Sequence, residues 1–208
     1  MRPAYSRIAW GLALELIDFR IQSFDILPDA LGYLLIMIGL AGVRPRNGKF
    51  IAGWLAAGAL LLESLPRLVG GLPILNLLEP QALDFYELLM MAGIALVEMM
   101  MLYGICIGIR EQSLSEERHA GLAHSALRTW QAVFGFGASM LIALPFTQTT
   151  QWSTMLPWTF VLGLGSFIAG LWVIALVRRA GKQNDKGSGT EGKARGMDQV
   201  TVKNEFGE

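Results

Sequence analysis

Six apolar segments follow one another along the first 179 residues, separated by polar or charged connections. A helix needs about 20 apolar residues to cross about 30 Å of hydrocarbon. Residues 88–109 and 155–177 meet this length. Residues 50–65 and 130–146 are shorter but nearly free of charge. This pattern predicts a membrane-spanning helix in each of the four segments.

The two remaining segments are weaker candidates for spans. Residues 28–43 would form a helix of about 24 Å, which spans only if the bilayer thins or one end is buried in protein. Residues 5–19 carry Glu15 and Asp18 in their second half. This first segment is therefore either a transmembrane helix or an amphipathic helix that lies in the interface.

The distribution of cations favours six spans. With the N-terminus inside, 15 of the 17 cations fall in inner segments, and only Arg20 and Arg67 fall outside. Loops on the cytoplasmic side of membrane proteins carry such an excess of Lys and Arg. A surface helix at the start would place Arg2 and Arg7 on the wrong side. We therefore predict six spans with both termini in the cytoplasm.

Composition agrees with a membrane protein. Of the 208 residues, 53% are apolar and 16% charged, with a mean hydropathy of +0.44 and a net charge of zero. These values exclude a soluble globular enzyme and a disordered regulator, as well as a nucleic-acid binder, which needs a basic surface. We expect an all-α membrane protein, a compact six-helix transmembrane bundle with short loops over residues 1–179, whose partner is the lipid bilayer.

Two segments are expected outside the bilayer. Residues 180–208 are rich in glycine and mixed charge, which predicts a disordered cytoplasmic tail. In residues 111–127, the spacing of Ser113 and Glu116 is that of a capping box and predicts a short cytosolic helix, broken near Gly121. This segment also holds both histidines, too far apart on a helix for joint metal ligation. We expect no metal and no cofactor, since the sequence contains no nucleotide-binding or zinc-protease motif.

An ionisable group inside a span is a candidate functional residue because its burial in lipid is costly. Glu98 lies near the middle of residues 88–109. At 100° per residue it shares one helix face with Glu87 and Asp84, and Met91, Ala95 and Leu102 complete this stripe. The stripe predicts either a path for a cation or proton, or a protonated Glu98 that bonds a neighbouring helix below two solvated loop acids.

A second group of charged residues surrounds the connection between the first two segments. Asp18, Arg20, Asp25 and Asp29 fall within twelve residues. Pro28 favours a helix that begins there, with Asp29 in its first turn, where its charge suits the helix dipole. Arg20 is an expected partner of Asp18 or Asp25. We interpret the group either as an outer-face site or as a capped turn with a local salt bridge.

The same residues carry a resemblance to a known group of proteins. The string Asp18-x-Arg20-Ile21, Phe24-Asp25-Ile26-Leu27-Pro28-Asp29 and Gly32-Tyr33 resembles the N-terminal signature of small bacterial multi-pass integral membrane proteins. The resemblance covers about the first 45 residues, and these proteins have no established activity. It implies the bacterial cytoplasmic membrane and assigns no site residue.

Three classes of function remain open from the sequence. The first is a non-enzymatic accessory or regulatory subunit, bound to a membrane protein partner or to a second copy of itself. The alternative is a small transporter or channel for an ion, or a proton-coupled or small solute, that uses Glu98. The third is a membrane enzyme, which we rank last because no catalytic residues converge.

Overall fold

The computed structural model describes residues 2–16, 20–21, 24–25, 29–43, 48–68, 85–115, 120–149 and 152–205. These residues form six helices and one pair of two-residue strands. In chain order the elements are α1 (Arg2–Leu16), β1 (Arg20–Ile21), β2 (Phe24–Asp25), α2 (Asp29–Val43), α3 (Lys49–Leu68), α4 (Phe85–Ser115), α5 (Ala120–Thr149) and α6 (Trp152–Glu205). The fold is therefore helical, apart from an antiparallel hairpin between α1 and α2.

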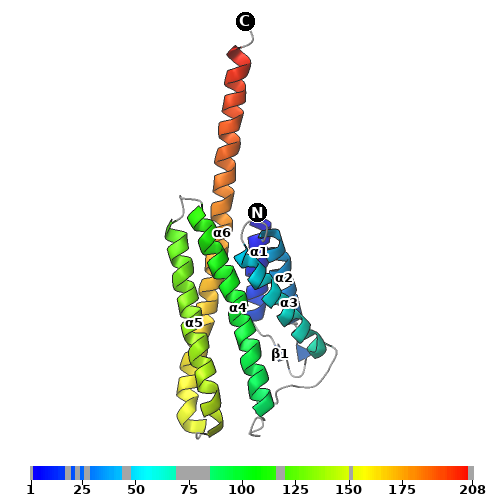
Figure 1. Ribbon diagram of the computed structural model, residues 1–208, viewed down its shortest axis with the longest axis vertical. Coiled ribbons are helices and arrows are strands. Elements are labelled where there is room, and N and C mark those ends of the chain that lie inside the picture. The colour runs from blue at the N-terminus through cyan, green and yellow to red at the C-terminus, as the bar shows by residue number, and fades with distance from the viewer. Residues whose placement is uncertain are drawn as a thin grey trace.

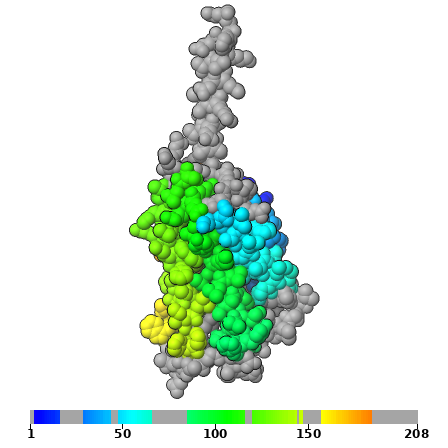
Figure 2. Space-filling model, in the orientation of Figure 1, coloured from blue at the N-terminus to red at the C-terminus, as the bar shows by residue number. Residues whose placement is uncertain are grey.

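The helices run alternately in opposite directions and form a closed ring (Figure 1). Each helix packs on the next in sequence, and α6 packs back on α1. The start of α1 and the extension of α6 lie at the same end of the ring, which we call the terminal end. The end at which α1 stops and α4 begins is the loop end. In Figure 2, α3, α4 and α5 form one face of the molecule.

Glycines allow the closest approaches between neighbouring helices. A Cβ atom on Gly39 of α2 would lie 2.5 Å from Ile8 Cγ1 of α1. A Cβ on Gly104 of α4 would meet the backbone of Gly53 in α3. Small residues at such contacts let helix backbones approach each other without side chains between them.

Burial is concentrated at the terminal end. All buried residues of α4 lie between Met101 and Ser113. The described part of α5 is buried only at or before Val133, and that of α6 only at or after Ala169. The Tyr5 hydroxyl of α1 donates a hydrogen bond of 2.6 Å to Gln112 Oε1 in the same half. The terminal half of the ring is therefore closed by a packed core, whereas α4, α5 and α6 bury less toward the loop end.

The outer surface of the ring is apolar. Large side chains that are more than half exposed occur on α1, α3, α4, α5 and α6, including Trp10, Leu55, Leu62, Phe85, Leu96, Phe134, Ile142, Trp158, Phe160 and Trp172. Among the described residues, two helical segments are long and apolar enough to cross a membrane by length and composition, namely α4 and residues Pro157–Gln183 of α6. These two segments support a membrane protein only weakly.

The prediction of a separate cytosolic helix in residues 111–127 is wrong. Helix α4 continues to Ser115, and α5 begins at Ala120. The Ser113 hydroxyl donates a 2.7 Å hydrogen bond to the carbonyl of Ile109, one turn earlier in α4. Ser113 therefore lies inside α4 and caps no helix, whereas Glu116 lies outside the described residues.

The C-terminal segment also differs from the expectation. We predicted disorder from residue 180 onward, but α6 continues as a helix to Glu205. Extending an existing helix avoids the cost of nucleation, and no proline follows Pro157 to interrupt the backbone hydrogen bonds.

Candidate functional site

A cavity of about 510 Å³ lies inside the ring, between α1, α4, α5 and α6. Its polar lining residues are Glu15, Glu98 and Ser166. The other lining residues are apolar: Leu12, Leu16, Met91, Ala95, Met99, Leu102, Val133, Gly137, Met140, Leu141, Gly163, Phe167, Ala169, Gly170 and Val173. A volume of this size, apolar with a few polar groups, is typical of small-molecule sites.

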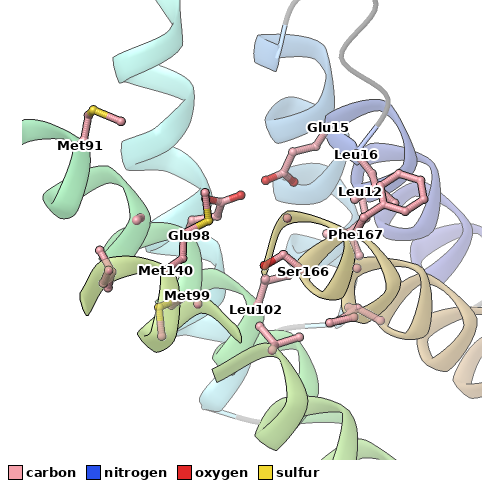
Figure 3. A pocket seen from close by; sticks show the side chains of 18 residues that line it. Leu12, Glu15, Leu16, Met91, Glu98, Met99, Leu102, Met140, Ser166 and Phe167 are labelled. Atoms are coloured by element: carbon pink, nitrogen blue, oxygen red, sulfur yellow. The ribbon is translucent and has the colours of Figure 1, made fainter. Parts of the chain in front are cut away.

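Two carboxyl groups meet at the wall of this cavity. Glu15 extends from α1 and Glu98 from α4, and Figure 3 shows their carboxyl groups facing one another. The two carboxyl groups lie close enough to act on each other electrostatically. Two ionised carboxylates at such a distance repel each other strongly in an apolar surrounding, so the pair favours retaining one proton. The pair is therefore a site that can hold a proton between two helices that are not neighbours in the ring.

Helices α2 and α3 add further polar groups beside the pair. The buried Tyr33 of α2 is hydrogen-bonded to Glu15. The carboxyl groups of Asp29 and Glu63 lie close enough to act electrostatically on Tyr33. Acidic side chains from α1, α2, α3 and α4 thus lie near Glu15 and Tyr33. Among the described residues, no three Asp, Glu, His or Cys side chains are placed to hold a metal ion.

One carboxyl oxygen at the site has no hydrogen-bond partner. Glu15 Oε2 is buried and makes no hydrogen bond within the described part of the chain. A buried polar atom without a partner costs free energy. Here it belongs to a side chain that borders the cavity, so the vacant position is within reach of a molecule that enters.

The structure places the predicted stripe of α4 along the cavity. Met91, Ala95, Glu98 and Leu102 all line it, as expected for residues that share one helix face. Glu87 lies in the first turn of α4 and is not part of the lining. Asp84 lies outside the described residues. The continuous acidic path from the outer surface therefore stays a prediction.

The second predicted group is brought to the site only in part. Asp18 lies outside the described residues. The hairpin register sets Arg20 opposite Asp25, consistent with one of the expected pairings at the level of the backbone. Asp29 lies in the first turn of α2, as predicted, and acts electrostatically on Glu15.

Glu15 is the site residue that our sequence analysis did not propose. Glu15 stands three residues before Asp18, on the same helix face, at the start of the second charged group, but we did not include it among the candidate site residues. The criterion that singled out Glu98, an ionisable residue in an apolar segment, applies equally to Glu15. Applied consistently, it would have identified both members of the pair but not their contact.

Comparisons with known proteins give no further identification. No protein-family model matches the chain, and no curated protein or solved structure is significantly similar to it. The function is therefore argued from the site itself.

Proposed function

We propose that this protein is a six-span integral membrane protein that carries a small solute across the bilayer in exchange for protons held by Glu15 and Glu98. The observation that carries this proposal is the cavity inside the ring, apolar except for Ser166 and a carboxyl pair. A cavity provides room for a solute, and the pair provides a site that exchanges protons.

The charges of the described residues support six spans. Of their 14 cations, Arg20 and Arg67 lie at the loop end. The other 12 lie in the terminal half of the ring or in the extension of α6: Arg2, Arg7, Lys49, Arg110, Arg128, Arg178, Arg179, Lys182, Lys186, Lys193, Arg195 and Lys203. By contrast, Glu15, Asp29, Glu63 and Glu87 lie toward the loop end. Charged residues at both ends of an apolar belt are typical of a protein that spans a bilayer. By the positive-inside rule, the basic end is the cytoplasmic end.

The distribution of packing favours a carrier over an open channel. The cavity lies beside the half of α4 that buries no residue, and the core around Met101 and Ile105 closes the other half. A solute in the cavity would thus reach one side of the membrane only. Movement to the other side requires the Tyr5–Gln112 hydrogen bond and its surroundings to open while the loop end closes, as in alternating access.

The experiment follows proton movement with a pH-sensitive dye enclosed in proteoliposomes that contain the purified full-length protein. Concentration gradients are applied with a panel of organic cations, organic anions and neutral solutes that fit the cavity. We expect at least one class to drive a change of the internal pH, and Glu98→Gln to abolish it. The matched control is Glu111→Gln, which changes the same type of residue on the same helix outside the cavity and should keep the pH change.

Absence of solute-driven proton movement with every solute class would contradict carriage in exchange for protons. If a stoichiometric membrane protein also copurified with the chain in mild detergent, the accessory-subunit hypothesis would replace our proposal. A pH change that is the same in Glu98→Gln as in the wild type would show that this carboxyl is structural.

A further inference from the structure

We propose that the occupant of the cavity is a lipophilic organic cation of single charge, such as a quaternary ammonium or phosphonium ion, which exchanges for one proton at the Glu15–Glu98 pair. This inference rests on the proposed solute carriage and narrows it to one chemical class. Charge, coordination and the character of the cavity wall each support it.

The charge of the lining selects a cation. Glu15 and Glu98 are the ionisable groups among the described lining residues, and both are acids. The buried, unpartnered Glu15 Oε2 is a vacant acceptor that a cation satisfies electrostatically. An anion would meet like charge in an apolar surrounding, where such repulsion is strong.

The scarcity of oxygen ligands argues against an inorganic cation. Calcium and magnesium require six or more oxygen ligands at short distances. The described lining offers two carboxyl groups and the Ser166 hydroxyl, and no described acids are placed as a metal site. A small metal ion would have to keep most of its water in an apolar cavity.

The rest of the wall suits a cation with apolar substituents. Met91, Met99 and Met140 present polarizable thioethers, which adapt to irregular apolar shapes. Phe167 adds an aromatic ring, whose face attracts a cation. Several of these side chains surround the carboxyl pair in Figure 3, so an ion with a central charge and apolar arms meets a matching environment.

The loop end of the molecule is acidic as a whole. In the predicted topology, the outer connections together with the acids of the adjoining spans (Glu15, Asp18, Asp29, Glu63 and Glu98) hold nine of the 17 acids and two of the 17 cations. A surface of one sign raises the local concentration of counter-ions and speeds their association. At the loop end the helices around the cavity bury fewer residues. This same end of the molecule therefore attracts cations.

Proton exchange keeps the charge of the site balanced. When the cation enters, one carboxyl O–H bond of the pair breaks, and the proton leaves to water while the electron pair stays on the carboxylate. One positive charge replaces another, so no uncompensated charge is left in the apolar cavity. The titratable groups that act on Glu15 from α2 are Asp29 and Tyr33, and Glu63 of α3 acts on Tyr33. The described lining from α5 and α6 contains no titratable group.

The test uses tetraphenylphosphonium as the probe and the full-length protein in detergent micelles. Titration calorimetry in two buffers with different ionisation enthalpies gives both the affinity and the number of protons released. We expect saturable binding, release of about one proton, and an affinity that falls up to tenfold per unit decrease in pH, the limit for competition with one proton. These measurements need only the wild-type chain.

Variants then locate the site. Glu15→Gln and Glu98→Gln should each weaken tetraphenylphosphonium binding by at least tenfold, whereas Glu111→Gln should leave it unchanged. Gly163→Leu adds bulk at a lining position where a Cβ meets no atom within 4 Å and should also weaken binding by obstructing the cavity. Size-exclusion profiles confirm that each variant is folded.

Each contrary outcome has a distinct meaning. No binding of the probe, together with proton movement driven by neutral or anionic solutes, would overturn the cation assignment and leave solute carriage intact. Binding that is independent of pH and unaffected by both glutamate substitutions would place the probe elsewhere and overturn this inference. Absence of proton movement with every solute would overturn the proposed carriage itself.

Discussion

Tyr33 is hydrogen-bonded to the same carboxyl group that pairs with Glu98. Side chains from α1, α2 and α4 thus form one group of interacting polar residues around Glu15. The Tyr33 hydroxyl orients the Glu15 carboxyl without itself lining the cavity. It is therefore a positioning residue, and its contribution can be separated from that of the pair.

Replacing Tyr33 by Phe should weaken tetraphenylphosphonium binding about tenfold, equivalent to about 1.4 kcal/mol, because one hydrogen bond to a charged group is lost. The phenyl ring keeps the packing of the buried side chain, so the unfolding temperature should change little. Calorimetry and thermal unfolding measure the two effects.

Tyr103→Phe is the matched control for this prediction. Tyr103 contacts Trp130 edge to face at 5.2 Å between ring centres and does not line the cavity. Equal affinities of the Tyr33→Phe variant and the wild type would show that Tyr33 is a packing residue only.

Also at the residue scale, the local sequence pattern identified Glu98, one member of the carboxyl pair. Glu98 stands alone in an apolar run of 22 residues, so its burial could be predicted from its position in that run. Its contact with Glu15 could not be predicted in this way, because the two residues are 83 positions apart and meet only through the closure of the ring. A contact between helices that are not neighbours depends on global packing, which no single-segment pattern encodes.

Helix contacts through glycine are the clearest determinants at the scale of elements. A Cβ on Gly104 would collide with the backbone of Gly53, and a backbone cannot move aside as a flexible side chain can. Gly108 lies one turn further along α4, where a Cβ would be 2.5 Å from Phe50 Cε1. The Gly104-x-x-x-Gly108 spacing is therefore used inside the ring, at the contact of α3 with α4.

Gly104→Ala should destabilise the protein by about 1–3 kcal/mol, the usual range for overpacking, and lower its unfolding temperature in detergent. The control is Gly93→Ala on the same helix, where a Cβ meets nothing within 4 Å. Alanine is the better helix former by about 1 kcal/mol, so this control should be unchanged or more stable. Similar unfolding temperatures for the two variants would contradict the close contact.

Helix faces were more predictable than helix ends. The period of 3.6 residues correctly grouped Met91, Ala95, Glu98 and Leu102 on one face of α4. The ends of α4 and α5 were missed because apolar content marks the part of a helix suited to a bilayer. A helix that emerges from this zone keeps its backbone hydrogen bonds, as Ser113 does with Ile109, and no change of hydropathy marks its true end.

For the molecule as a whole, an alternating path of six helices returns the chain to the end at which it began (Figure 1). The apolar segments predicted the number of helices, and consecutive helices pack on one another in alternating directions. The cavity was not predictable, since it arises where α4, α5 and α6 bury few residues toward the loop end, and this depends on packing between helices rather than on hydropathy.

The orientation of the ring in a membrane can be tested with reporter fusions in a bacterial host. Fusions after Gly48, before the body of α3, and after Gln183, in the extension of α6, should fluoresce with green fluorescent protein and lack alkaline phosphatase activity. A fusion at Gln148, in the last turn of α5, should show the reverse. The reason is that Gly48 and Gln183 lie at the basic terminal end, whereas Gln148 lies at the loop end, between residues without charge.

Phosphatase activity after Gln183 would invert the topology, and a cytoplasmic signal at all three positions would mean that α5 does not cross the membrane. Because the acidic, less packed side of the cavity is assigned to the exterior through this topology, the same fusions decide from which side of the membrane the solute enters.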